Sequence, residues 1–138
     1  MKSHIRFLAE SENFKVVSEH ENVDLYFKNN TRKTICIGDF YGDPSCAIIS
    51  RDEKYAVSAG CGLIIYLLKN PYEEFQYNNH CVQYTEVFRD PKNIWWIDAL
   101  YQSEQDLDLK YFRFVATNNE GENIYKINVE TLEIEKLS

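Results

Sequence analysis

The sequence offers few residues whose type and spacing could support a reaction. Its three histidines are His4, His20 and His80, and a general base needs a partner within hydrogen-bond reach. His80 precedes Cys81, but neighbouring residues on a strand point to opposite faces, which prevents direct pairing of the two. His20 lies in a polar turn between acidic residues, where a solvated histidine is expected. The histidines therefore make a weak case for acid–base catalysis.

Signatures of nucleophilic catalysis, phosphate binding and metal binding are equally weak. The chain has no Gly-x-Ser-x-Gly elbow and no Gly-rich loop that leads into Lys-Ser or Lys-Thr. Gly60-Cys61-Gly62 leads into an apolar run, which indicates a bend. Asp39 and Asp43 flank a turn like half a calcium loop, but the other ligand positions lack carboxylates. We predict no catalytic, cofactor-binding or metal-binding residue, and an uncharacterised small enzyme is only the third alternative.

The four cysteines favour reduced thiols. Cys36, Cys46, Cys61 and Cys81 are separated by 10, 15 and 20 residues, so no close C-x-x-C pair marks a zinc site. Two disulfides would require an exported chain. Cys36 and Cys46 lie in apolar, strand-like segments and are interpreted as small core residues. A metal or a disulfide stays open as the alternative.

Acidic and aromatic residues give the strongest functional signal. The chain has 22 Asp and Glu against 15 Lys and Arg, a formal charge of −7, and 14% aromatic residues. An acidic chain repels phosphate, which argues against nucleic-acid binding. Acidic clusters beside Tyr and Trp fit docking onto a basic protein, although each cluster alone is explained by solubility. The predicted partner contacts are Asp39, Tyr41, Asp43, Glu73, Glu74, Trp96, Asp106 and Asp108.

Short segments rich in Val, Ile, Tyr and Phe recur between turn signals and predict antiparallel strands. An apolar run over residues 63–68 implies a strand buried on both faces. Trp95 and Trp96 point to opposite faces if extended, so one is expected in the core and the other partly exposed. Residues 71–75, preceded by Asn70, fit one helical turn. The predicted strands are 14–18, 23–28, 34–40, 46–50, 55–59, 63–68, 81–88, 94–97, 111–117, 123–129 and 133–137.

Two segments, 45–68 and 111–137, share a strand–turn–strand–turn–strand pattern that resembles part of a β-propeller blade. The Trp-Asp and Gly-His signatures of such repeats are missing. At roughly 40–45 residues per blade, 138 residues give about three, too few for an ordinary closed propeller. We therefore predict a single mainly β domain over 1–138, in which antiparallel meanders form an open sheet or sandwich with at most one or two short helices.

Apolar residues near the N-terminus come in short pieces, whereas a secretory signal needs about 7–15 in a row. The longest apolar run, 63–68, is far shorter than the ~20 residues of a spanning helix. The sequence therefore predicts a soluble, cytoplasmic protein.

The whole profile resembles the immunity proteins of bacterial polymorphic-toxin systems, particularly those of contact-dependent growth inhibition. The resemblance is carried by Gly38-Asp39-Phe40-Tyr41-Gly42-Asp43, the meander over 47–68, and Trp95-Trp96 in a small acidic chain. It implies a cytoplasmic inhibitor that blocks one cognate toxin domain, commonly a nuclease with a basic active-site surface. From composition and spacing we also predict no direct contact with nucleic acid, membrane or metal. The alternative is a β-rich scaffold or adaptor domain that mediates protein–protein interaction.

Overall fold

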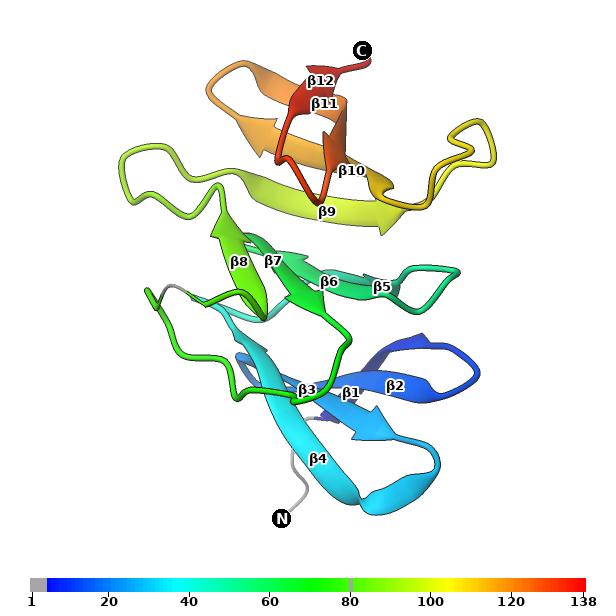
Figure 1. Ribbon diagram of the computed structural model, residues 1–138. Helices are drawn as coiled ribbons and strands as arrows, with labels where there is room; N and C mark the ends of the chain where they lie inside the picture. The colour runs from blue at the N-terminus through cyan, green and yellow to red at the C-terminus, as the bar shows by residue number, and fades with distance from the viewer. Residues whose placement is uncertain (1–4, 80) are drawn as a thin grey trace.

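The computed structural model describes residues 5–79 and 81–138, which form three four-stranded antiparallel sheets (Figure 1). In each sheet the strands are neighbours in chain order. Sheet 1 consists of β1 (Ile5–Glu10), β2 (Phe14–Glu19), β3 (Asn22–Phe27) and β4 (Asn30–Asp39). Sheet 2 consists of β5 (Cys46–Ile49), β6 (Tyr55–Gly60), β7 (Gly62–Leu67) and β8 (Tyr84–Val87). Sheet 3 consists of β9 (Trp96–Tyr101), β10 (Tyr111–Asn118), β11 (Gly121–Asn128) and β12 (Ile134–Lys136).

Sheet 2 lies between the other two sheets and is buried on both faces (Figure 1). Because side chains alternate along a strand, Ile64 and Tyr66 of β7 face sheet 1, whereas Leu63 and Ile65 face sheet 3. The expectation of a strand covered on both sides is confirmed for β7. The mainly β fold of open antiparallel meanders is also confirmed, and none of the three sheets closes into a barrel.

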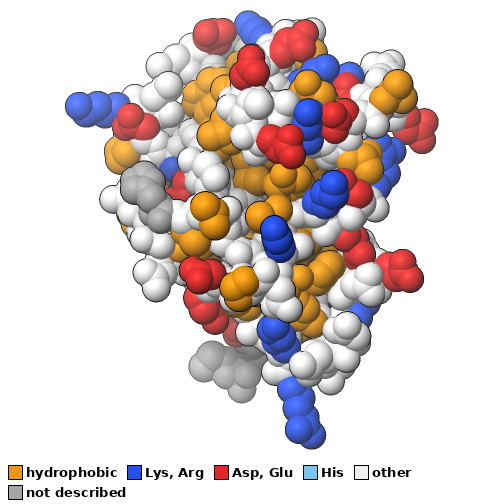
Figure 2. All heavy atoms as spheres, in the orientation of Figure 1, with side chains coloured by type: hydrophobic (Ala, Val, Ile, Leu, Met, Phe, Trp, Pro, Cys, Tyr) orange, Lys and Arg blue, Asp and Glu red, His pale blue; other side chains and the backbone are white. Residues whose placement is uncertain are grey.

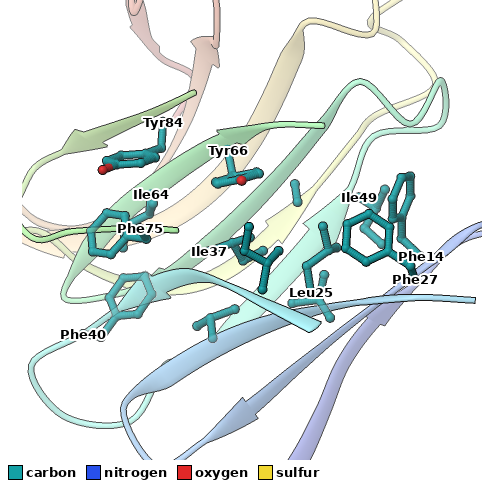
Figure 3. Close-up of a cluster of buried hydrophobic side chains, with 14 residues drawn as sticks. Phe14, Leu25, Phe27, Ile37, Phe40, Ile49, Ile64, Tyr66, Phe75 and Tyr84 are labelled. Carbon is teal, nitrogen blue, oxygen red and sulfur yellow. The ribbon is translucent and has the colours of Figure 1, made fainter. Parts of the chain in front are cut away.

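Sheets 1 and 2 approach one another along β1 and β5, and β9 of sheet 3 lies beside both β5 and β6 of sheet 2. Between sheets 1 and 2, the first strands contribute small side chains such as Ala9 and Ala47. Farther out the layer is filled by rings, among them Tyr66, Phe75 and Tyr84 (Figure 3). Rings also lie at the β5 side of this layer, where Phe14 and Phe27 pack near Ile49 (Figure 3).

A second apolar cluster fills the layer between sheets 2 and 3, and it includes Ile48 of β5 and several rings. Phe88 stacks on Trp95 with 4.2 Å between ring centroids, and Trp95 lies 4.7 Å from Tyr125.

Three details differ from the sequence prediction. Each meander has four strands, because β8 joins β7 and β9 joins β10. The first strand, β1, was not predicted, since a bulge between Phe7 and Ala9 breaks its alternation. The prediction of a helical turn over 71–75 is wrong. The Phe75 amide instead donates to the Cys36 carbonyl at 2.9 Å, so this segment covers the β4 edge.

The cysteines are free thiols, with Cys61 buried and the other three half-buried. Burial raises the pKa of the Cys36 thiol to about 11. Cys36 pairs with Asp24 across β3 and β4, and both residues lie on the face of sheet 1 that points away from sheet 2. Among the described residues, no helix has the length and apolar character needed to cross a membrane.

Candidate functional site

A pocket of about 450 Å³ opens where the ends of sheets 1 and 2 meet the segment that leads into sheet 3. We call it the Tyr41–Tyr77 pocket. The turn between β2 and β3, the turn after β4, the bend between β6 and β7, and the loops around β8 all contribute to it. Its volume lies within the usual range of ligand and side-chain sites. It is lined by Glu21, Asp39, Phe40, Tyr41, Cys61, Tyr77, Arg89, Pro91 and Ile94.

Tyr41 is exposed on a turn that is held by hydrogen bonds. The Phe40 amide donates to the Glu21 carbonyl at 2.9 Å, and the Gly42 amide donates to Glu21 Oε2 at 2.7 Å. Gly42 has a φ of +83°, a conformation that favours glycine. The ring of Tyr41 is 79% exposed. An aromatic side chain on a fixed backbone loses little entropy when a partner covers it.

Tyr77 flanks the pocket on a second anchored loop. The Gln76 amide donates to the Tyr84 hydroxyl at 3.2 Å, and the Asn78 amide donates to Glu86 Oε2 at 2.8 Å. The loop is therefore tied to β8 on both sides of Tyr77, whose side chain is 62% exposed. The pocket thus carries two exposed tyrosines on supports that belong to different sheets.

Arg89 joins the two supports. Its guanidinium lies 4.8 Å from the Phe40 ring centroid and 5.7 Å from that of Tyr77. Nη2 donates to the Asp39 carbonyl at 2.8 Å, and Nε lies 3.0 Å from Glu86 Oε1. Among the described residues, Nη1 is buried without a hydrogen-bond partner, and the partner of Nε is the Glu86 carboxylate in this ion pair. Arg89 therefore clamps the end of sheet 1 onto sheet 2.

Gly62 makes room for this clamp. A Cβ at Gly62 would lie 2.3 Å from Arg89 Cγ and 2.6 Å from the Val87 carbonyl oxygen. Its φ of +82° also favours glycine. The Gly60-Cys61-Gly62 bend is therefore needed for close approach of the arginine stem as well as for the turn itself.

The pocket combines apolar walls with an excess of negative charge. Phe40, Pro91 and Ile94 are apolar, while Glu21 and Asp39 are carboxylates. Glu86 offsets the positive charge of Arg89. Arg89 therefore does not neutralise the two carboxylates that line the pocket. A lysine or arginine side chain from another molecule would place its aliphatic stem on the rings and its charge near these carboxylates. Elsewhere, acidic and basic side chains are interspersed on the face that Figure 2 shows.

Comparisons with known proteins give no match. No model of a known protein family fits the chain, and no significant relative is found among curated proteins. The chemistry of the pocket is therefore the basis for any functional proposal. Among the described residues, no group of three or more His, Cys, Asp or Glu side chains could hold a metal ion. His4 and His80 lie outside the described residues, and His20 is exposed in the turn after β2.

The structure places the eight predicted contact residues in different regions. Asp39 and Tyr41 line the pocket, and Asp43 is exposed in the same turn. Glu73 and Glu74 are exposed in the segment beside β4, where Glu74 Oε2 accepts the Cys36 amide at 2.8 Å. Glu74 thus has a structural partner at a sheet edge.

The remaining predicted residues belong to sheet 3. The division of the two tryptophans is confirmed, since Trp95 packs against the core and Trp96 is 47% exposed. Trp96 pairs with Thr117, so its side chain shares the face of sheet 3 that points away from sheet 2. Asp108 is exposed and lies 3.3 Å from the Lys110 ammonium. Asp106 is buried.

Asp106 is held by two cations. Its oxygens accept from Arg113 Nε at 2.9 Å and Nη2 at 3.0 Å, and the Lys126 ammonium lies 3.4 Å away. The hydrogen bonds from Arg113 are the main cause that lowers the pKa of this carboxyl. Asp106 therefore fixes the 102–110 loop to sheet 3. Its prediction as a partner contact has no geometric support, because the carboxylate is used within the chain.

Glu21, Tyr77 and Arg89 are among the pocket residues that sequence reasoning missed. Glu21 could have been found, because the predicted hairpin over 23–40 places the residues before it opposite Asp39. Tyr77 and Arg89 lie in the weakly patterned region 69–93 and carry no signal of their own. Their role depends on contacts between sheets, which periodicity does not report.

Proposed function

We propose that this chain is a protein-binding domain that neutralises a basic partner, as an immunity protein blocks a cognate toxin domain. The observation that supports the proposal is the Tyr41–Tyr77 pocket, in which two exposed tyrosines on anchored loops flank two carboxylates. Rigid aromatic anchors beside a charged group are typical of the few residues that dominate binding energy in protein interfaces.

The chemistry of the pocket favours a protein over a phosphate-bearing ligand. Glu21 and Asp39 repel phosphate, while Tyr41 and Tyr77 offer apolar surface to an aliphatic stem. Toxins that cleave nucleic acids need basic active-site surfaces to hold phosphates. A nuclease domain is therefore the partner class that we propose, with Tyr41 and Asp39 as the first contacts.

The proposed mechanism has two stages. The formal charge of −7 attracts a basic partner over a Debye length of about 8 Å at physiological salt. Docking then removes water from Tyr41 and Tyr77, and a partner lysine or arginine approaches Asp39 and Glu21. Because the tyrosine loops are already tied by hydrogen bonds, little ordering opposes this step.

Affinity capture from an extract of the source cells tests the proposal. The bait is the wild-type chain, a Tyr41→Ala/Asp39→Asn double variant, or a Glu133→Gln control that removes an exposed carboxylate in the turn before β12 of sheet 3. We expect a basic polypeptide to be retained by the wild type and by the control and lost from the double variant. The proposal is wrong if every basic polypeptide is retained equally by all three baits.

A scaffold or adaptor domain is the second candidate. It is favoured by a specific observation, the open stack of three sheets whose two outer faces carry exposed apolar side chains. A scaffold would use those faces or the sheet edges, so its binding would survive the Tyr41→Ala/Asp39→Asn substitution. The same capture experiment therefore separates the two candidates.

A further inference from the structure

The guanidinium of Arg89 leaves one donor unused at the Tyr41–Tyr77 pocket. Nε pairs with Glu86 Oε1 at 3.0 Å, and Nη2 donates to the Asp39 carbonyl at 2.8 Å. In the part of the chain that the structure describes, Nη1 is buried and has no partner. The Arg89 side chain is only 9% exposed, so bulk water does not replace the missing hydrogen bond. Native structures keep few buried donors without an acceptor, because each one is costly.

The fold makes room for this costly arrangement at a boundary between two hollows. A side chain at Gly62 would exclude the arginine, since its Cβ would lie 2.3 Å from Arg89 Cγ. Arg89 lines the Tyr41–Tyr77 pocket and also a neighbouring pocket of about 570 Å³ beside β8. Tyr77 and Pro91 line both pockets as well. The unused donor therefore belongs to a wall with open space on two sides, where another molecule can supply an acceptor.

We propose that Arg89 is a further partner-binding residue, and that its Nη1 donates to a main-chain carbonyl of a basic segment docked in the pocket. This inference rests on the proposed function and adds what the partner must present. A lysine or arginine of that segment supplies the cation for Glu21 and Asp39, and the backbone beside it supplies the acceptor. The pocket then recognises a basic residue within a peptide chain rather than a cation alone.

The charges around Arg89 favour a neutral acceptor. Three carboxylates, Glu86, Glu21 and Asp39, surround the single guanidinium. Asp90 adds another in the lining of the neighbouring pocket. A carboxylate or phosphate brought to Nη1 would be repelled by this negative charge. A peptide carbonyl brings no net charge, and a hydrogen bond from an ionised donor is stronger than one between neutral groups.

An acceptor reaches the buried Nη1 only if one of the two flanking rings moves. The guanidinium lies 4.8 Å from the Phe40 ring centroid and 5.7 Å from that of Tyr77. Phe40 belongs to the core between sheets 1 and 2, whereas Tyr77 is mostly exposed. Exposed side chains change rotamer within nanoseconds, so Tyr77 is the ring that yields when a partner docks. Its loop stays tied to β8 through the Asn78 amide and Glu86.

Two small monocations test the inference by NMR titration of the intact chain. N-acetyl-lysine N-methylamide carries main-chain carbonyls beside its ammonium, whereas n-pentylammonium carries the ammonium on a plain alkyl chain. The amide resonances of Gly42 and Asn78 report binding, because these residues lie on the two anchored loops. We expect the capped lysine to bind the wild type at least about 10-fold more tightly than pentylammonium. The Arg89 guanidinium protons should shift with the capped lysine alone.

The ratio of the two affinities separates this hydrogen bond from the structural role of Arg89. Arg89→Lys keeps a charged stem but removes Nη1, and the ratio should fall to within about 2-fold. Tyr77→Ala is the matched control in the same wall. It should weaken both probes through lost apolar contact and leave the ratio at about 10-fold or more. Arg89→Met replaces Arg89→Lys if circular dichroism shows that the latter is unfolded.

Equal affinity of the two probes for the wild type, or a ratio that persists in Arg89→Lys, would overturn the inference. Both outcomes retain cation binding in the pocket, so the proposed function would stand. Loss of the ratio in Tyr77→Ala, or no shift at Gly42 and Asn78 with either probe, would also overturn the inference. Failure of the proposed function is seen separately, when the Tyr41→Ala/Asp39→Asn bait retains every basic polypeptide that the wild type retains.

Discussion

The molecule contains two arginine–carboxylate sites that differ in how completely the arginine is satisfied. Arg113 makes two hydrogen bonds to buried Asp106, and Lys126 adds a second cation. Arg89 pairs through Nε with Glu86 and through Nη2 with the Asp39 carbonyl, but its Nη1 has no hydrogen-bond partner among the described residues. The first site closes a loop over sheet 3, and the second lines an open pocket.

This difference indicates separate roles. A buried polar group with all its partners is typical of structural ion pairs, whereas an unsatisfied one needs an explanation such as strain or function. At Arg89 the unsatisfied Nη1 coincides with a pocket and two exposed tyrosines. The charge pattern of the sequence could not distinguish the two sites, because it predicted Asp39 of the pocket and buried Asp106 alike as partner contacts.

The largest expected effect comes from Gly62→Ala, which attacks the Arg89 site. The new Cβ would overlap Arg89 Cγ and the Val87 carbonyl, and φ is +82°. We expect the free energy of unfolding to fall by about 4 kcal/mol or more. Urea denaturation gives this value.

Gly121→Ala is the control in sheet 3, since φ is +90° there but nothing lies within 4 Å of the added Cβ. The expected loss in the free energy of unfolding is about 1–2 kcal/mol. Equal losses would contradict the assigned role of Gly62.

Removing the carboxylate charge at the other site has the next largest effect. Asp106→Asn leaves Arg113 and Lys126 without their buried anion, and we expect a loss of about 3 kcal/mol at pH 7. Thermal unfolding monitored by circular dichroism measures it. A loss below about 1 kcal/mol would show that the loop is held by something else.

Asp106 also predicts a pH dependence. Its folded-state pKa is lowered, first by the hydrogen bonds from Arg113, so its contribution is present above the unfolded pKa of about 3.9 and is lost as pH falls through the folded pKa. As the pH falls from 5 to about 2, the free energy of unfolding should therefore decrease less in Asp106→Asn than in the wild type. Parallel curves would count against the ion cluster.

Replacing the two arginines by methionine sharpens the comparison. Met keeps the stem at each position but removes the guanidinium. Arg89→Met should cost about 1–2 kcal/mol, because it removes the hydrogen bond to the Asp39 carbonyl and the ion pair with Glu86, while loss of the unsatisfied Nη1 offsets part of that cost. Arg113→Met should cost more, since Asp106 stays buried with Lys126 alone. Urea denaturation of the pair decides the order, and the reverse order would contradict the distinction between the sites.

The smallest expected effect has the opposite sign. Burial and the nearby Glu19 and Glu74 carboxylates raise the pKa of Asp24. Its charged form is therefore unfavourable in the folded state, and this penalty is full above the raised pKa and absent below the unfolded pKa. Asp24→Asn should stabilise the protein by about 0.5 kcal/mol at pH 7. A destabilising effect measured by urea denaturation at pH 7 would reveal an unrecognised partner.

The sequence predicted the strands well where alternation or an apolar run persisted. The segments over 23–28, 46–50, 55–59 and 111–117 all became strands. It failed at β1, where a bulge interrupts the pattern, and at 71–75, where hydrogen bonds to Cys36 override local helix signals. Both failures come from pairing with distant strands, which local propensity does not contain.

The candidate site was predicted only in part. Asp39, Tyr41 and Asp43 stand out because they share one short turn. Asp106 has the same composition signal, but its burial depends on Arg113 and Lys126 from two other strands. Arg89 and Tyr77 enter the pocket through the packing of sheet 1 on sheet 2, so no one-dimensional pattern could identify them.

The most direct test of the proposed function is the salt dependence of binding kinetics with the captured basic partner. Surface plasmon resonance would compare the wild type with Tyr41→Ala, Asp39→Asn and the Glu133→Gln control. We predict that Tyr41→Ala speeds dissociation at least about 30-fold at all salt concentrations. Asp39→Asn should slow association, and more strongly at low salt than at high salt. Rates equal to those of the wild type in both pocket variants would contradict a binding role for the Tyr41–Tyr77 pocket.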